Sequence, residues 1–354
     1  MQTQVLPPSA EALALAADLL RRGQLVAFPT ETVYGLGANA LDADAVRAIF
    51  AAKGRPADNP LIVHIWSTAQ IEAFAELPEG AEALIERFWP GPLTLLMRRK
   101  PAIPDVVTAG LDTVAVRMPS HPTARALLRA CGLPVAAPSA NRSGRPSPTT
   151  AAHVSEDLNG VVPLILDGGA CEVGLESTVL DLCHGTPCIL RPGGVTQEQL
   201  SSVLGPVDIA GSVLRPLQTG EVARSPGMRY RHYAPKGDLT LVTGPEEETL
   251  SALRLLYERD TAAGYRTGVF CFEEHAKTLA DCHPFRMGRL SDPASVAERL
   301  FDLLRQADDA GIERIYSEVV PPTGIGLAVM NRLGRAAAFK SIPAREVLDQ
   351  IKEE

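Results

Sequence analysis

The sequence contains 354 residues, of which 45% are hydrophobic and 21% are charged, and its formal net charge at pH 7 is −8. The length favours two domains, because one hydrophobic core of this size would be unusual. The acidic charge excludes capture of nucleic acid by a broad basic surface and leaves room only for a transient RNA contact. No apolar run approaches the roughly 18 residues that cross a membrane. No secretion signal is recognisable either, so we expect a cytoplasmic protein without a membrane partner.

The N-terminal half alternates amphipathic helices with short apolar strands. The spacing of apolar residues predicts helices over residues 10–22, 42–52, 122–131 and 148–157. Apolar runs predict strands over residues 25–28, 61–65, 113–118, 164–166 and 188–191, with two more inside residues 88–97 and 174–182. Polar residues recur at the ends of these strands, as a concave site on a mixed β-sheet requires.

The segment 135–149 joins a short apolar run to a loop that is rich in hydrogen-bond donors. Hydroxyl, amide and guanidinium groups of this kind can hold an anion. The alternative is an exposed connection, because Ser, Asn, Gly and Pro mark any loop. The donors are Ser139, Asn141, Arg142, Ser143, Arg145 and Ser147.

Two further polar segments lie in the same half. Residues 29–37, Pro-Thr-Glu-Thr-Val-Tyr-Gly-Leu-Gly, are expected to form a site loop or, alternatively, a tight turn whose hydroxyls bond their own backbone. Lys53 and Arg55 follow a predicted helix. They either complement the helix dipole or, with Asn59 behind them, hold a polyphosphate.

Two ionisable side chains interrupt apolar strands. His64 is either a satisfied core residue or a ligand-binding residue. Arg117 stands in the run Thr-Val-Ala-Val-Arg-Met. A buried cation is costly unless it is paired, so Arg117 should meet either an acidic neighbour or the anion of a ligand.

The pattern weakens after about residue 205, and residues 218–236 are mostly polar or turn-forming. We therefore expect a larger, site-bearing domain over residues 1–210, a linker over residues 211–237 and a smaller domain over residues 238–354. In the last of these, strands over 239–243, 268–272 and 314–318 alternate with helices over 246–258, 291–310 and 326–338. This order predicts a Rossmann-like α/β domain with a largely parallel sheet. The six cysteines lack Cys-x-x-Cys spacing, which predicts buried free thiols and no structural zinc.

Several enzyme signatures are absent from the sequence. It has no Gly-x-x-x-x-Gly-Lys-Ser/Thr loop and no Gly-x-Gly-x-x-Gly fingerprint, so a bound nucleotide would depend largely on side chains. It also lacks a recognisable Ser-His-Asp elbow, a His-Glu-x-x-His helix and a cysteine nucleophile with its base. The cationic and neutral donors that remain suit the alignment of reactants and the stabilisation of anions, as in phosphoryl and nucleotidyl transfer.

The chain resembles the YrdC-like family, in its two-domain form, through five motifs: Pro29-Thr-Glu-Thr-Val-Tyr-Gly-Leu, Lys53-Gly-Arg-Pro-x-x-Asn-Pro-Leu, Trp89-Pro-Gly-Pro-Leu-Thr, Val116-Arg-x-Pro and Pro138-Ser-Ala-Asn. The motifs lie within residues 8–200, and residues 225–235 resemble the linker of that form. The resemblance implies an α/β protein with an N-terminal twisted mixed β-sheet, flanking helices and a concave active site, followed by a smaller α/β domain.

The resemblance further implies L-threonylcarbamoyladenylate synthase activity. In this nucleotidyl transfer, L-threonine, bicarbonate or carbon dioxide, and ATP give threonylcarbamoyl-AMP and pyrophosphate, with Mg²⁺ accompanying ATP. The implied partner is a transferase that moves the threonylcarbamoyl group to the adenosine beside the anticodon of ANN-decoding tRNAs.

The family's site residues can be placed on this sequence one by one. Lys53 and Arg55 are expected to act in catalysis by neutralising charge on the phosphates. The linker is expected to cover the site and to bring Tyr230 or Tyr233 to the nucleotide, a choice that the sequence leaves open. The expected ATP contacts are Lys53, Arg55, Asn59, Thr113, Ser139, Asn141, Ser147, Arg191 and Tyr233. The expected threonine contacts are Thr32, His64, Arg117, Ala137 and Ser177.

Two other functions stay open at this point. A carbamoyl-transfer enzyme of hydrogenase maturation shares the YrdC-like domain, but it resembles a longer chain with Cys-x-x-Cys zinc motifs and an acylphosphatase segment, which this sequence lacks. A non-catalytic RNA-binding module would need a basic face. Residues 1–235 instead contain 19 Lys and Arg against 22 Asp and Glu.

Overall fold

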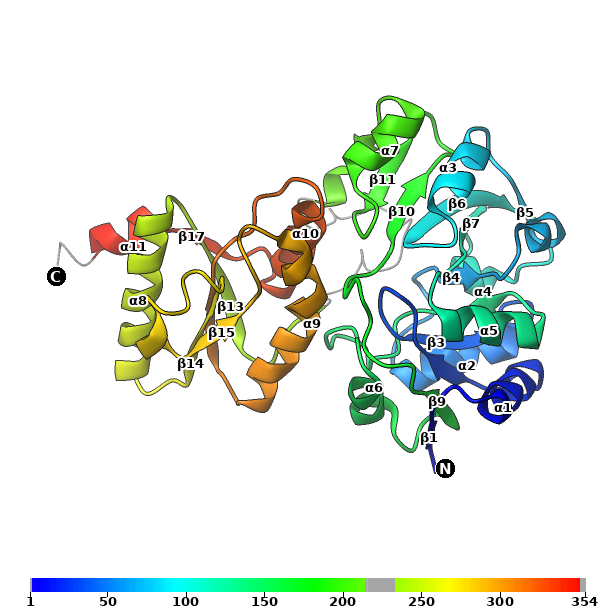
Figure 1. Ribbon diagram of the computed structural model, residues 1–354, viewed down its shortest axis with the longest axis horizontal. Helices are drawn as coiled ribbons and strands as arrows, with labels where there is room; N and C mark the ends of the chain where they lie inside the picture. Colours follow the sequence, from blue (N-terminus) through cyan, green and yellow to red (C-terminus); the bar gives the residue numbers. More distant parts are fainter. Residues whose placement is uncertain (1, 214, 216–232, 351–354) are drawn as a thin grey trace. The chain divides into compact units, whose positions relative to one another are not determined.

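The computed structural model describes residues 2–213, 215 and 233–350. The chain divides into two compact units (Figure 1). The first consists of residues 1–143 and 147–230, and the second of residues 144–146 and 231–354. Each unit contains its own β-sheet with helices packed on it, so each has its own hydrophobic core.

The first unit is built on a mixed sheet, which has 12 strands among the described residues. Its order is β1-β9-β2-β3-β8-β4-β7-β6-β10-β11-β12, and β5 pairs with β6 outside this path. The β4–β7 pair is parallel and the β6–β7 pair is antiparallel, which confirms the predicted mixed sheet. The strands are β1 (Gln4–Leu6), β2 (Val26–Phe28), β3 (Gly35–Asn39), β4 (Ile62–His64), β5 (Ala75–Glu76), β6 (Leu93–Arg99), β7 (Thr113–Arg117), β8 (Val135–Ala136), β9 (Leu164–Leu166), β10 (Thr178–Asp181), β11 (Cys188–Arg191) and β12 (Asp208–Ile209).

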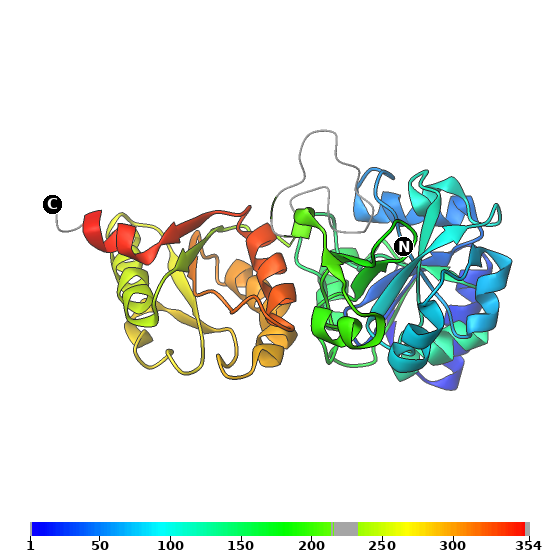
Figure 2. The same cartoon turned by 90° about the horizontal axis from the view of Figure 1, so that it is seen from above.

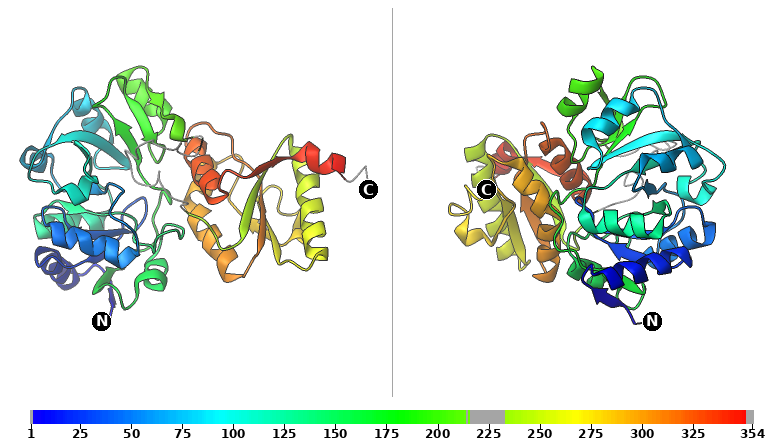
Figure 3. Two further views of the ribbon diagram at one scale, coloured as in Figure 1. Left: turned by 180° about the vertical axis from the view of Figure 1, so that it is seen from behind. Right: turned by 45° about the vertical axis from the view of Figure 1, so that its right-hand side comes forward.

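Capping residues set the ends of helices in the first unit, as α2 illustrates. The Asp42 side chain accepts from the backbone N–H groups of Asp44 and Ala45 and so caps α2, which ends at Gly54 in the left-handed conformation. Helices α1 and α5 pack against each other (Figure 3). The helices are α1 (Ala10–Arg21), α2 (Ala43–Lys53), α3 (Ala81–Phe88), α4 (Asp105–Thr108), α5 (Pro122–Cys131), α6 (Ala151–Leu158) and α7 (Gln197–Leu204).

The two faces of the central strands carry different kinds of residue, because side chains alternate along a strand. One face contributes Val63, Leu95 and Val116 to the main core of the unit. The opposite face carries a small apolar cluster of Ile62, Leu96, Ala115, Val179 and Leu190. Strand register places polar side chains beside that cluster: His64 pairs with Arg117, and Arg117 pairs with Thr94. This polar face is the framework of the candidate site.

The second unit is a parallel α/β domain, as predicted. Its five strands follow the order β15-β14-β16-β13-β17, and every pair is parallel. Helices α8 and α11 cover one face of this sheet, and α9 and α10 cover the other (Figures 1 and 2). The elements are β13 (Asp238–Thr243), α8 (Glu246–Ala262), β14 (Thr267–Cys271), β15 (Pro284–Arg286), α9 (Pro293–Asp309), β16 (Arg314–Ser317), α10 (Gly326–Ala336), β17 (Ser341–Pro343) and α11 (Ala344–Gln350).

The structure shortens one predicted loop. Strand β3 begins at Gly35, inside the loop expected over residues 29–37. A Cβ atom at Gly37 would lie 2.8 Å from the Phe28 ring, so this strand needs glycine where a typical strand has a branched apolar residue. Because two of its residues are glycines, β3 lacks the run of apolar residues by which strands are predicted.

Candidate functional site

Lys53 joins two of the predicted phosphate-binding segments. It is the last residue of α2, is buried, and donates from Nζ to the carbonyl oxygens of Ser139 and Asn141, the latter at 2.6 Å. Ser139 Oγ in turn donates to Asn141 Oδ1 at 2.5 Å. The helix end and the loop after β8 therefore form one hydrogen-bonded cluster.

The electrostatics of this cluster favour an anion. Burial, followed by repulsion from Arg55, lowers the pKa of Lys53 well below its usual value. The Arg55 guanidinium carbon lies 5.1 Å from the centre of the Phe50 ring. A nearby negative charge would offset the cost of keeping two neighbouring cations charged.

Asn59 is a buried polar residue that the fold does not satisfy. Its relative exposure is 0%, and neither its Oδ1 nor its Nδ2 atom hydrogen-bonds any residue in the described part of the chain. Such groups cost about 1–3 kcal/mol each, so they are rare unless they serve a ligand or another function. Thr113, another predicted nucleotide contact, is buried at the start of β7.

Arg117 lies at the end of β7 and is held on three sides. Its Nη2 lies 2.7 Å from Glu31 Oε1, its Nη1 donates to Thr32 Oγ1 at 2.9 Å, and its Nε donates to the Gly91 carbonyl at 3.2 Å. Of the two expected partners of Arg117, the structure contains the acidic neighbour, which is Glu31; contact with the anion of a ligand stays a prediction. Glu31 and Thr32 belong to residues 29–34, which connect β2 to β3.

His64 occupies the end of the neighbouring strand β4 and is buried beside Arg117 in the sheet register. Burial and the charge of Arg117 lower its pKa to about 3, so the imidazole is neutral at neutral pH. Its Nδ1 lies 3.2 Å from the Ile62 carbonyl oxygen. A neutral His64 can exchange hydrogen bonds with a ligand, but it cannot balance the charge of one.

A second hydrogen-bonded group surrounds Ser177. Its hydroxyl lies 2.7 Å from Thr94 Oγ1 and accepts from Arg191 Nη2 at 3.1 Å, and Arg191 Nε donates to the Ser177 carbonyl. Gly193 makes this packing possible, because a Cβ atom there would lie 2.3 Å from the Glu176 carbonyl oxygen. Ser147 Oγ donates to Glu176 Oε1 at 2.6 Å.

All of the predicted site residues except Tyr233 thus lie in the first unit, and several of them belong to the hydrogen-bonded groups described above. Ala137 follows β8, is buried, and donates its N–H to the Ile62 carbonyl at 2.9 Å. Arg142 donates to the Asp157 carbonyl at 2.8 Å, a contact that fixes its loop to the end of α6. The roles predicted for the site residues stay predictions, because the geometry shows proximity and burial rather than bound substrate.

Of the two linker tyrosines, only Tyr233 lies among the described residues. Tyr233 belongs to the second unit, where its ring lies 5.0 Å from that of Phe301 and is buried. Tyr230 lies outside the described residues. The expectation that one of them reaches the nucleotide therefore stays a prediction.

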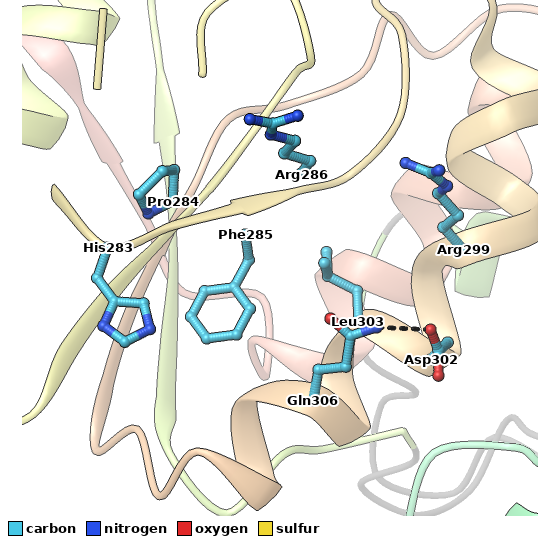
Figure 4. A pocket seen from close by; sticks show the side chains of 8 residues that line it. All are labelled: His283, Pro284, Phe285, Arg286, Arg299, Asp302, Leu303 and Gln306. Carbon is cyan, nitrogen blue, oxygen red and sulfur yellow. Dashed lines mark hydrogen bonds between the residues drawn. The ribbon is translucent and has the colours of Figure 1, made fainter. Parts of the chain in front are cut away.

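A separate cavity of about 490 Å³ lies in the second unit, between β15 and α9 (Figure 4). It contains none of the predicted site residues. Two of its charged side chains already have partners within the unit: Arg299 forms an ion pair with Glu273, and Asp302 accepts a hydrogen bond from Gln306. The lining residues are His283, Pro284, Phe285, Arg286, Arg299, Asp302, Leu303 and Gln306.

The described residues contain neither a membrane-spanning helix nor a cluster of potential metal ligands. None of the helices there is both long and apolar enough to cross a membrane. Likewise, no group of three or more His, Cys, Asp or Glu side chains in that part of the chain could hold a metal ion. All six cysteines are free thiols, four of them buried and two partly buried.

Sequence reasoning missed three residues of the site: Glu31, Thr94 and Glu176. Glu31 and Thr94 stand inside two of the five motifs, next to Thr32 and Leu93, whereas Glu176 precedes Ser177 in the segment 174–182. A carboxylate close to a predicted strand and next to a predicted site residue was an available sequence signal for Glu31 and Glu176. Only strand register shows that Thr94 faces Arg117.

Comparison with known proteins identifies relatives for both units. Residues 18–193 match the family model Sua5_yciO_yrdC, described as "Telomere recombination", and residues 195–338 match the model described as "Threonylcarbamoyl-AMP synthase, C-terminal domain". A threonylcarbamoyl-AMP synthase of Pyrococcus abyssi is 47% identical over 93% of this chain and 95% of its own length. One of Bacillus subtilis is 48% identical over 93% of this chain and 94% of its own length.

A solved structure agrees with these matches. The crystal structure of Pyrococcus abyssi Sua5 complexed with L-threonine is 45% identical, has a TM-score of 0.91, and covers 96% of this chain and 99% of its own. By sequence and by fold, therefore, the chain belongs to the Sua5/YciO/YrdC family, in the two-domain form that carries the Sua5 C-terminal domain.

Proposed function

We propose that this protein is a threonylcarbamoyl-AMP synthase. It would join L-threonine, bicarbonate or carbon dioxide, and ATP into threonylcarbamoyl-AMP, and would release pyrophosphate. The relatives named threonylcarbamoyl-AMP synthase, and a solved relative complexed with L-threonine, support this assignment. Within the structure, the observation that carries it is the buried Lys53 cluster beside Arg55, in the same unit as the buried Arg117.

The Lys53 cluster suits the triphosphate of ATP. Burial and the charge of Arg55 lower the pKa of Lys53, and nearby phosphate oxygens would offset this penalty. Ser139 and Asn141 supply neutral donors beside them, and the unsatisfied amide of Asn59 supplies another. Thr113, Ser147, Arg191 and Tyr233 complete the proposed nucleotide contacts.

The Arg117 group suits an amino acid. A guanidinium can bind a carboxylate with two parallel hydrogen bonds, and the hydroxyls of Thr32 and Ser177 stand beside polar partners in the same unit. A substrate with a carboxylate and a hydroxyl, such as L-threonine, matches this set of groups. His64 and Ala137 complete the proposed threonine contacts.

The proposed reaction needs no nucleophile from the protein. The threonine amine forms a bond to the carbon of carbon dioxide and loses a proton to solvent, which gives a carbamate. With bicarbonate, the amine's proton and the displaced hydroxide leave together as water. A carbamate oxygen then attacks the α-phosphorus, and the bond from that phosphorus to the bridging oxygen of the β-phosphate breaks. Lys53 and Arg55, with the Mg²⁺ that accompanies ATP as part of the substrate, neutralise charge on the departing pyrophosphate.

The product is a reactive mixed anhydride, so a second enzyme should consume it soon after release. We propose that this partner is the transferase that moves the threonylcarbamoyl group to the adenosine beside the anticodon of ANN-decoding tRNAs. Any contact of the present protein with tRNA would then be transient. The nucleotidyltransferase class, the Mg²⁺ requirement and the cytoplasmic location stay predictions.

Omission of single substrates tests the proposed activity. The purified protein is supplied with ATP, bicarbonate and L-threonine, and pyrophosphate release is measured with each substrate left out in turn. We expect release only when all three are present. Lys340→Ala serves as a control, because Lys340 is exposed and pairs with Asp238 in the second unit. Pyrophosphate release that ignores threonine would overturn the assignment.

A further inference from the structure

Glu31 is a buried carboxylate whose only close ionic partner in the described part of the chain is Arg117. The relative exposures of the two side chains are 5% and 3%, and Arg117 Nη2 lies 2.7 Å from Glu31 Oε1. The other two contacts of the guanidinium, to Thr32 Oγ1 and the Gly91 carbonyl, are with neutral groups. Glu31 is therefore the group that balances the charge of Arg117.

The carboxylate is charged but poorly satisfied. Burial is the strongest single influence and raises the pKa of Glu31, but the charge and polar contact of Arg117, together with the backbone amides of Glu31 and Ser120, bring the pKa below its usual value. None of these contacts gives either carboxylate oxygen a hydrogen bond of good geometry with a donor among the described residues. An ionised carboxylate accepts several hydrogen bonds when it can. Glu31 thus retains acceptor capacity in the group that surrounds Arg117.

The balance of charge around Arg117 indicates which ligand group the Glu31 carboxylate can bind. If the carboxylate of a ligand binds Arg117, two carboxylates share one buried guanidinium, which leaves an excess negative charge. A zwitterionic amino acid removes that excess when its ammonium group faces the second carboxylate. His64 cannot balance the excess negative charge, because its pKa of about 3 leaves the imidazole uncharged at neutral pH.

We propose that Glu31 binds the α-ammonium group of the amino-acid substrate while Arg117 binds its carboxylate, so that the pair selects a zwitterion. This inference rests on the proposed function, because it assumes that an amino acid is the ligand of Arg117. Glu31 is then a substrate-binding residue. It does not serve as the base that removes the amine proton, because Arg117 keeps its carboxylate ionised and weakly basic.

A ligand that lacks the ammonium group tests the proposal. 3-Hydroxybutyrate is threonine with hydrogen in place of that group, and it keeps the carboxylate and the β-hydroxyl. Titration calorimetry gives the affinity of both ligands for the wild-type protein and for Glu31→Gln, which keeps the shape and removes the charge. We expect the wild type to prefer threonine by about tenfold or more, the size of one charge-assisted hydrogen bond. In Glu31→Gln the two affinities should become nearly equal.

Controls separate this role from a structural one. Glu318→Gln removes another buried carboxylate, one that accepts from the Phe272 N–H in the second unit, and it should leave the preference intact. If Glu31→Gln does not fold, Glu31→Asp replaces it in the test. This variant shortens the side chain by one methylene and moves the carboxylate away from the ligand, so it should reduce the preference for threonine while 3-hydroxybutyrate binds as before.

The outcomes distinguish two kinds of failure. An equal loss of affinity for both ligands, in either Glu31 variant, means that Glu31 only positions Arg117, and this overturns the inference while the proposed function stands. A wild-type protein that binds neither ligand overturns the proposed function itself.

Discussion

Replacing Asn59 with leucine should make the protein more stable and less able to bind ATP. Asn59 is fully buried, and its two side-chain polar atoms lack hydrogen-bond partners within the described residues. Each such atom costs about 1–3 kcal/mol, whereas an apolar group of similar shape avoids that cost. We therefore expect Asn59→Leu to raise the free energy of unfolding of the ligand-free protein by about 1–3 kcal/mol.

The same substitution removes a proposed nucleotide contact. We expect the dissociation constant for ATP to rise about tenfold, which corresponds to about 1.4 kcal/mol. Opposite signs for stability and binding identify a residue that is kept for its ligand rather than for the fold.

Urea denaturation followed by tryptophan fluorescence measures the stability term. Both tryptophans of the chain, Trp66 and Trp89, lie in the first unit, so the signal reports the unit that contains Asn59. Calorimetry gives the ATP affinity. Asn59→Asp is the matched control, because it keeps the shape and adds a buried charge, and it should lower the stability. A less stable Asn59→Leu variant with unchanged ATP affinity would refute the reasoning.

Three further substitutions test other parts of the site. Lys53→Met keeps the length of the side chain and removes its charge, so the rate of pyrophosphate release should fall by about a hundredfold or more. An unchanged rate would mean that other residues hold the phosphates. Gly193→Ala would place a Cβ atom 2.3 Å from the Glu176 carbonyl oxygen, so we expect a lower melting temperature in thermal unfolding and a higher KM for threonine, and neither change would be seen if the turn adapts freely. The pKa of His64 falls from 6.5 to about 3 on folding, so the unfolded chain binds a proton that the native protein does not. The free energy of unfolding should therefore decrease as the pH falls from about 6.5 towards 3, and His64→Gln, compared by urea denaturation at about pH 7 and about pH 5, should lose part of this dependence.

Much of the fold could be read from apolar patterning. The helix over residues 122–131 and the strands over 164–166 and 188–191 are confirmed with their predicted bounds. Each has a clear boundary signal or an uninterrupted apolar run. Strand β3 could not be read in this way, because Gly35 and Gly37 pack against Phe28 and replace the expected apolar residues. The short edge strand β1 has too few residues for a periodic pattern.

The site was only partly predictable for a related reason. Sequence reasoning could assign Arg117 a partner of opposite charge, but not identify Glu31, because the two residues are 86 positions apart and meet only in the folded sheet. The bond between Lys53 and the Ser139 loop is likewise a tertiary contact. Composition and motif spacing show which groups are present, whereas strand register decides which of them face one another.

Labelled bicarbonate gives the most direct test of the central claim. The protein is incubated with ATP, L-threonine and ¹³C-bicarbonate, and the reaction is followed by mass spectrometry and ¹³C NMR. The proposed function predicts an adduct of threonine and AMP that carries the label in a carbamoyl carbon, formed together with pyrophosphate. Formation of AMP and pyrophosphate with no labelled adduct would contradict it.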